Sequence, residues 1–242
     1  MNRPIILINE GCSMSTFTSA TIKGLIKAHG YPIDIAKNEL YKFDANPYYI
    51  EGMGVVDLLE KTIAKLPNIC FKLPYMYLKE RSDCLTLLKN KNARICFIER
   101  FNLLDNAICL LKDFFDKSDR EEFTFEEWRK SEDRLEKKVD SSLVLKKINI
   151  LSDNRKTKLK LMQTHTEQKE FIYAEDLCNL KIEAYENLFE TLEYKIDKNL
   201  TKKFLEKKKI KKLYKHKDVI DCPDIDAFKN ELKNNGFLGF WR

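Results

Sequence analysis

Residues 4–26 read PIILINEGCSMSTFTSATIKGLI, and this stretch decides the fold class. It opens with PIILIN at 4–9, an Ile-rich apolar run that is typical of a buried parallel strand. Small and polar residues follow at 10–16, and the apolar spacing from Phe17 to His29 then predicts a helix. A strand that passes through a tight turn into a helix is the opening unit of an α/β domain that binds phosphate.

Short apolar runs and amphipathic stretches continue to alternate along the chain. Buried strands are predicted at 68–73, 93–99 and 170–174, and helices at 53–66, 82–90 and 102–115. Further helices are predicted as one or two segments within 117–170, at 181–195, at 199–213 and within 218–242. This order implies a parallel sheet with right-handed crossovers. We therefore expect an α/β fold: a three-layer sandwich with a central parallel sheet of four or five strands, like that of P-loop nucleotide-binding proteins, and a helical C-terminal part.

The composition favours one folded domain. The 242 residues are 43% apolar and 11% aromatic, which is enough for a core. We expect a single domain over 1–242, with a charged helical insertion at about 117–168 and a helical part at about 180–242. No run approaches the ~20 apolar residues of a membrane span. We interpret residues 1–10 as the first strand rather than as a signal peptide.

The cysteines favour a reducing compartment. The seven stand at positions 12, 70, 84, 96, 109, 178 and 222, and no two of them have C-x-x-C spacing. A zinc site therefore has little support. An odd number of cysteines without a secretion signal favours free thiols, so a cytoplasmic location is expected.

Positive charge gathers near the C-terminus. The chain has a net charge of +6, and segment 201–217 alone contains nine lysines and one glutamate. Apolar residues such as Phe204, Leu205 and Leu213 predict that this segment is a helix with one buried face. We favour the interpretation that these lysines only keep the protein soluble. The alternatives are that they attract an anionic acceptor or that they contact nucleic acid or a membrane, and no specific nucleic-acid partner is expected.

The turn after the first strand is a candidate anion site. Its residues are Gly11, Cys12, Ser13, Met14, Ser15 and Thr16. Backbone N–H groups at a helix N-terminus bind anionic oxygens, and small residues let the anion approach closely. The G-x-x-x-x-G-K-[ST] pattern of nucleoside triphosphatases is absent. An ordinary strand-to-helix turn with a Ser or Thr cap is the alternative.

Arg100 is the second candidate, because it stands at the carboxyl end of the strand predicted at 93–99. Ligands of open α/β sheets bind outside the carboxyl ends of the strands, and the planar guanidinium can hold a phosphate through two hydrogen bonds. Asn102, Asn106 and Cys109 follow it. The alternative is a surface arginine paired with a carboxylate.

Four stretches resemble, in order, the sulfotransferases that use 3′-phosphoadenosine-5′-phosphosulfate (PAPS). They are PIILINEGCSMSTFTSATIKGLI at 4–26, ICFKL at 69–73, ICFIERFNLLDNAICLL at 95–111 and FIYAEDL at 171–177. They look like the family's 5′-phosphosulfate loop, a strand ending in a lysine, the 3′-phosphate motif and a late Tyr-Glu-Asp-Leu type strand. The resemblance covers about 1–112 and 168–195 and is closest to compact bacterial and viral members.

The resemblance implies roles for particular residues. Gly11 to Phe17 would cradle the 5′-phosphosulfate, and Arg100 would hold the 3′-phosphate. Cys109 stands where the family usually has a serine, and Lys72 would lie near the sulfuryl group. The cofactor would be PAPS, with adenosine 3′,5′-bisphosphate as product and without a metal. The acceptor would be a hydroxyl or amine of a carbohydrate or small metabolite.

Two departures from the family pattern weaken the expected cofactor site. Family loops commonly carry Arg or Lys where this chain has Ser13 or Met14. Cysteine at 109 is also a weaker hydrogen-bond donor than serine. Both departures leave open a catalytically degenerate, nucleotide-binding relative.

Catalytic roles are predicted for three residues. Lys72 is the best cation for the leaving oxygen, although a strand-end lysine can also point into water. Glu39, in the segment NELYKF, is the first candidate for the general base, and His29 is the second. The alternative for Glu39 is a solvated carboxylate. The alternative for His29 is a histidine that the helix dipole favours at the end of a helix.

Three further residues have plainer interpretations. Glu175 and Asp176 follow the late strand, and we expect them to cap the next helix rather than to act as an acid/base pair. Trp128 could stack on adenine, although packing of its charged helix is favoured. The competing functions are a non-catalytic nucleotide- or anion-binding module, a P-loop nucleoside-phosphate kinase and a nucleic-acid binder.

Overall fold

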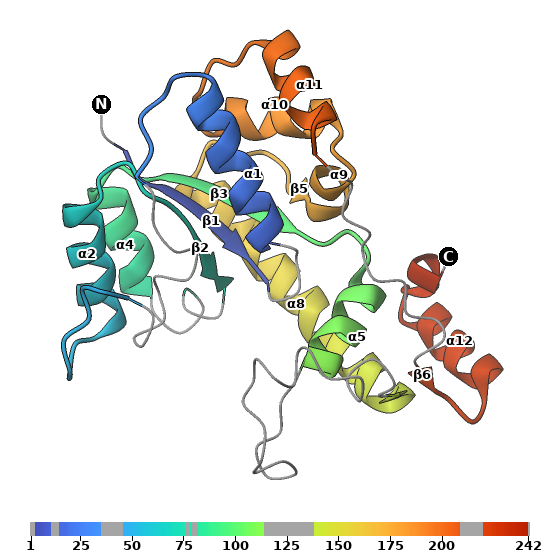
Figure 1. Ribbon diagram of the computed structural model, residues 1–242. Helices are drawn as coiled ribbons and strands as arrows, with labels where there is room; N and C mark the ends of the chain where they lie inside the picture. The colour runs from blue at the N-terminus through green and yellow to red at the C-terminus, as the bar shows by residue number, and fades with distance from the viewer. Residues whose placement is uncertain are drawn as a thin grey trace, which may run out of the picture. The chain divides into compact units, whose positions relative to one another are not determined.

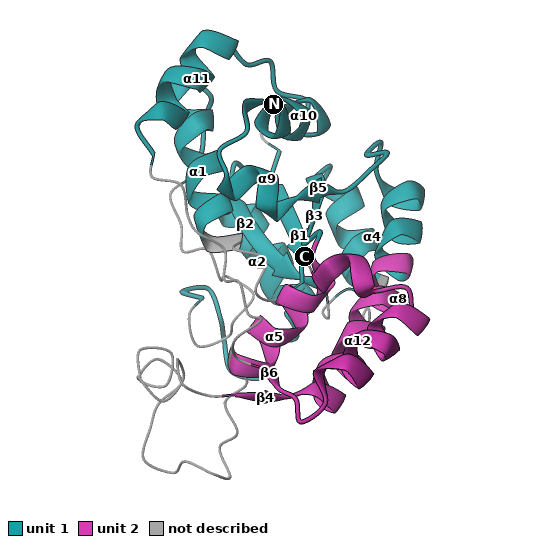
Figure 2. Cartoon of the chain, turned by 90° about the vertical axis from the view of Figure 1, so that its right-hand side faces the viewer, with its two compact units in different colours: residues 1–101, 157–213 teal, residues 102–156, 214–242 magenta. Residues whose placement is uncertain are grey.

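The structure is a computed structural model of the chain. It describes residues 3–10, 15–34, 46–75, 78, 82–113, 138–208 and 220–241. The chain forms two compact units, shown in two colours in Figure 2. Unit 1 contains residues 1–101 and 157–213, and unit 2 contains residues 102–156 and 214–242. The single domain expected from the sequence stays a prediction.

A parallel sheet of four strands lies at the centre of unit 1. The strands are β1 (Ile5–Asn9), β2 (Cys70–Pro74), β3 (Arg94–Glu99) and β5 (Ile172–Tyr173). Their order across the sheet is β2-β1-β3-β5, and every neighbouring pair is parallel. The α/β class and the parallel sheet predicted from the sequence are thus confirmed.

Helices cover both faces of this sheet (Figure 1). They are α1 (Ser15–Ala28), α2 (Val55–Lys65), α4 (Ser82–Asn90), the end of α8 (Ser141–His165), α9 (Ala174–Cys178), α10 (Ile182–Thr191) and α11 (Lys198–Glu206). Successive strand residues face opposite sides. Ile6 and Ile8 therefore pack with α2, α4 and α8, whereas Ile5 and Leu7 pack with α1, α9, α10 and α11.

Gly30 ends helix α1, directly after the helix predicted from Phe17 to His29. Gly30 has φ of +77°, a left-handed conformation that glycine adopts without steric cost. The Gly30 N–H donates to the Lys27 carbonyl at 3.0 Å, and the Tyr31 N–H donates to the Ile26 carbonyl at 3.1 Å. These two hydrogen bonds form a Schellman motif, which satisfies the last carbonyls of the helix.

Helix α11 contains the described part of the lysine-rich segment. Thr201 and Leu205 are buried, whereas Lys202 and Lys203 are exposed. The Phe204 ring lies against Gly24 of α1, where a Cβ atom would approach it to 2.6 Å. The predicted amphipathic helix is therefore confirmed for residues 201–206, and residues 209–217 lie outside the described part of the chain.

Unit 2 has a core of its own. It contains α5 (Leu103–Asp113), the first part of α8, α12 (Ile225–Asn234) and the short helix η3 (Leu238–Trp241). β4 (Val139–Asp140) and β6 (Ile220–Asp221) form a parallel two-residue ladder that the sequence did not predict. Helix α12 matches the helix predicted within 218–242, and the Asp224 carboxylate caps it by accepting from the N–H groups of Asp226 and Ala227. None of the described helices of either unit is long and apolar enough to cross a membrane.

The cysteines of the sheet are expected to resist alkylation in the folded protein. Burial raises the pKa of the Cys70 thiol to about 12 and also raises that of Cys96, so neither forms the reactive thiolate near neutral pH. Cys109 and Cys222 are half-buried. Mass spectrometry after a brief iodoacetamide treatment at pH 8 should find label on Cys222 and Cys109 and none on Cys70 and Cys96. Urea-unfolded protein, as the control, should be labelled at all four. Fast labelling of Cys96 in the folded protein would contradict the burial of this thiol.

Candidate functional site

The candidate site lies at the carboxyl edge of the sheet, where β1 and β3 end side by side. Asn9 of β1 stands opposite Ile98 of β3, so Glu10 and Arg100 both follow at the same edge. Strand β2 lies on one side of β1, and the chain then crosses to β3 on the other side of β1. The gap between β1 and β3 is therefore the topological switch point of the sheet. Open α/β sheets bind their ligands in the crevice outside such a point.

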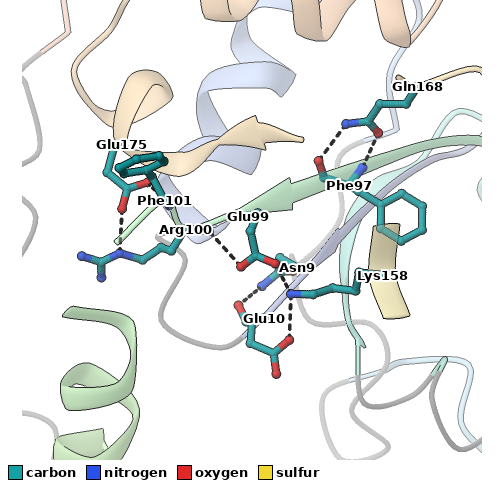
Figure 3. A network of polar contacts seen from close by, with 9 residues as sticks. All are labelled: Asn9, Glu10, Phe97, Glu99, Arg100, Phe101, Lys158, Gln168 and Glu175. Atoms are coloured by element: carbon teal, nitrogen blue, oxygen red, sulfur yellow. Dashed lines mark hydrogen bonds and ion pairs between the residues drawn. The ribbon is translucent and has the colours of Figure 1, made fainter. Parts of the chain in front are cut away.

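One buried ammonium group ties the two strand ends together (Figure 3). Lys158 of α8 places its Nζ 3.0 Å from the Glu10 Oε2 and pairs with the Glu99 carboxylate. The side chains of Lys158 and Glu99 are each only 2% exposed. The Lys158 ammonium also lies 5.4 Å from the ring centroid of Tyr75, which follows β2. Three of the four strands thus end around this one cation.

A second ion pair joins the end of β3 to helix α9. The Arg100 Nε donates to the Glu175 Oε1 at 3.2 Å, and the Phe101 N–H donates to the Glu175 Oε2 at 2.8 Å. The Arg100 N–H in turn donates to the Glu99 Oε1 at 3.0 Å. Arg100 therefore stands at the strand end as predicted, but its side chain is 1% exposed and is not a surface arginine.

Glu175 and Asp176 lie in the first turn of α9, whose N-cap residue is Tyr173 and which has no side-chain cap, so the capping role expected from the sequence is wrong. Their side chains contact different partners. Glu175 contacts Arg100 and Phe101, whereas Asp176 forms an ion pair with Lys181 at 2.5 Å. This Lys181 contact raises the Lys181 pKa, chiefly through the hydrogen bond from the ammonium to the carboxylate. The two carboxylates therefore do not form an acid/base pair.

The charges of the site limit which ligand it suits. Three carboxylates, Glu10, Glu99 and Glu175, contact two cations, Lys158 and Arg100. These five side chains together carry a net charge of −1. A ligand with several phosphates would therefore depend on backbone N–H groups and on cations beyond these five.

The structure places three of the predicted turn residues. Ser15 and Thr16 begin α1, and Phe17 is half-buried in its first turn. Gly11, Cys12, Ser13, Met14, Glu39 and Trp128 lie outside the described residues.

Lys72 stands within β2 rather than at its end, because the strand continues to Pro74. It is paired with Leu7 of β1 and is buried. Alternation along the strand puts it on the same face as Cys70, which packs with α1. Two residues of parallel strand cover about 6.6 Å, a distance that a lysine side chain can span toward the carboxyl edge.

His29 lies away from the carboxyl edge. Helix α1 starts at that edge and runs back, so His29 follows its far end (Figure 1). The His29 Nδ1 is 2.9 Å from the Leu25 carbonyl, and its Nε2 is 3.3 Å from both the Asp197 carbonyl and the Thr201 Oγ1. These contacts join α1 to α11, which fits the helix-end interpretation of His29 better than the role of general base beside Arg100.

Cys109 and Arg100 are divided between the two units. Cys109 is half-buried in α5 of unit 2, whereas Arg100 belongs to unit 1. The proposed pairing of these residues around one 3′-phosphate stays a prediction.

Sequence reasoning missed Lys158, Glu99 and Gln168. Lys158 lies in the run RKTKLK, whose pattern indicates a solvated helix face. The Gln168 side chain replaces a strand partner, since its Oε1 accepts from the Phe97 N–H at 2.7 Å and its Nε2 donates to the Phe97 carbonyl at 2.9 Å (Figure 3). No signal in the local sequence indicates either contact.

Metal ligands do not gather in the part of the chain that the structure describes: it contains no group of three or more His, Cys, Asp and Glu side chains suited to a metal ion. No protein-family model matches this chain, and no curated protein or solved structure is significantly similar to it.

Proposed function

We propose that this protein transfers a sulfuryl group from PAPS to a hydroxyl or amine, as its four family-like stretches imply. One observation carries the proposal: the stretch after β1 and Arg100 after β3 leave neighbouring strands at the same edge of the sheet. The FIYAEDL stretch supports it as well, because its Glu175 contacts Arg100 directly. Pieces that are far apart in the sequence thus converge where such a nucleotide would bind.

The proposed reaction is an in-line displacement at sulfur. The acceptor oxygen or nitrogen forms a bond to sulfur while the bond from sulfur to the 5′-phosphate oxygen breaks, and the acceptor loses its proton to a base. N–H groups at the start of α1 and the Lys72 ammonium would stabilise the negative charge that grows on the leaving phosphate. Adenosine 3′,5′-bisphosphate is the product.

Arg100 is proposed to bind the 3′-phosphate while Glu175 fixes its orientation. A guanidinium group has five N–H donors, and Glu175 accepts from the Nε. This contact orients the planar group, which could hold a phosphate through two hydrogen bonds once the ligand displaces what buries the side chain.

Preference for the 3′-phosphate tests the proposal. Wild-type protein should bind adenosine 3′,5′-bisphosphate at least tenfold more tightly than adenosine 5′-monophosphate, as titration calorimetry would measure. Arg100→Lys should remove most of this preference, because an ammonium group cannot donate the two parallel hydrogen bonds of a planar guanidinium group. Arg94→Lys is the matched control, since Arg94 begins the same strand and stacks on Tyr194. Absence of binding to wild-type protein, or an unchanged preference in Arg100→Lys, would refute the proposal.

A non-catalytic nucleotide-binding module is the second candidate. The departures at Ser13, Met14 and Cys109 favour it, because the chain lacks the cation and the hydroxyl donor that the family's cofactor site commonly has. This candidate predicts that the bisphosphate binds but that no labelled sulfuryl group passes from PAPS to any of a panel of hydroxyl and amine acceptors.

A further inference from the structure

Phe101 is the one exposed aromatic residue in the part of the chain that the structure describes. It is 56% exposed, although Arg100 beside it is almost fully buried. The other described Phe, Tyr and Trp residues are buried or half-buried. An exposed ring gives up the free energy that burial of its apolar surface would contribute. A single exposed ring at the switch point of the sheet is therefore a candidate contact for a ligand.

The structure also holds this ring in place. The Phe101 N–H donates to the Glu175 Oε2, and the Phe101 ring lies edge-to-face with Tyr173, with ring centroids 5.4 Å apart and an interplanar angle of 89°. Tyr173 is the last residue of β5 and belongs to the sheet. A ring fixed in this way loses little conformational entropy when a ligand stacks on it.

The chemistry of the ring indicates the kind of ligand group that Phe101 suits. Phe101 offers an exposed, uncharged aromatic surface, and aromatic side chains stack well on nucleobases because every base has a π-face. In a nucleotide, the base and the 3′-phosphate are held close together by one ribose. A side chain next to a phosphate-binding arginine is therefore well placed to meet the base.

We propose that Phe101, supported from behind by Tyr173 and Glu175, is the stacking surface for the adenine ring of the nucleotide whose 3′-phosphate Arg100 binds. This inference rests on the proposed function, because the proposed function supplies the identity of the ligand. It adds the residue that would recognise the base.

Two ligands separate contact with the base from contact with the phosphates. They are adenosine 3′,5′-bisphosphate and an abasic ribose 3,5-bisphosphate, which keeps both phosphates and lacks the adenine. Phe101→Ala should weaken binding of the first by about 5- to 150-fold, the range expected for one base stacked on one ring. Binding of the abasic compound should change less than twofold. Phe101→Tyr should retain most of the affinity, and Leu200→Ala, which shortens another exposed apolar side chain of unit 1, should change neither.

Each result of these titrations has one meaning. If wild-type protein binds neither bisphosphate, the proposed function fails and this inference fails with it. If wild-type protein binds the nucleotide and Phe101→Ala binds it equally well, only this inference is overturned. If Phe101→Ala lowers the affinity for both ligands equally, this inference is also overturned, because the side chain then supports the phosphate site and does not contact the base. An effect confined to the affinity for an aromatic acceptor would assign the ring to the acceptor and overturn it too.

Discussion

Replacing Lys158 with methionine should destabilise unit 1 by about 3–5 kcal/mol, the usual cost of removing one partner from a buried ion pair. The variant keeps an apolar side chain of similar length but leaves the Glu10 and Glu99 carboxylates without their shared cation. Hydrogen exchange of the β1 and β3 amides measures this loss, because these strands form the centre of the unit 1 sheet.

Lys160→Met is the matched control for this variant. Lys160 is exposed on the same helix, two residues further along, so the same substitution there should change stability by less than about 0.5 kcal/mol. The double variant Lys158→Met/Glu99→Gln should be more stable than Lys158→Met alone, since it removes one of the uncompensated charges. A Lys158→Met protein as stable as the Lys160→Met control would show that the ammonium does not hold the two strand ends.

The elements of unit 1 could be predicted from the sequence because local patterns determine them. The helix predicted at 82–90 is observed as Ser82–Asn90, and the strand predicted at 93–99 as Arg94–Glu99. Buried parallel strands are continuous apolar runs, and turn residues bound the helices between them. The class of the fold follows from the order of these elements.

The contacts of Lys158 could not be predicted in the same way. Glu10 is 148 residues away along the chain, and no periodicity connects a lysine in a charged helix with a carboxylate so distant. The sequence analysis expected one or two helices within 117–170, and α8, which runs from Ser141 to His165, agrees with this expectation. Its polar C-terminal half is held against the sheet by a few buried side chains such as Met162, which weakens the amphipathic pattern.

The candidate site could be predicted only in part. The position of Arg100 at a strand end follows from the apolar run before it, and the structure confirms that position. Its partner Glu175 comes from another strand end 75 residues later, which only the sheet order brings alongside. The two-residue strands β4 and β6 were missed, because runs so short carry no alternation.

Gln168→Leu should destabilise unit 1 by about 2–5 kcal/mol. Strand β5 pairs with β3 only at Ile98 and Glu99, and the Gln168 amide supplies the hydrogen bonds that a longer strand would give to Phe97. Leucine fills a similar volume but leaves the buried Phe97 N–H and carbonyl without these partners, and each such group costs about 1–3 kcal/mol.

The Phe97 amide reports on this contact directly. Its hydrogen exchange should accelerate in Gln168→Leu more than the overall loss of stability explains, because its own hydrogen bond is the one removed. Gln163→Leu is the matched control, since Gln163 is exposed near the end of α8 and the chemical change is the same. Unchanged protection of the Phe97 amide in Gln168→Leu would contradict the contact, since the side-chain oxygen would then not be what shields that N–H from water.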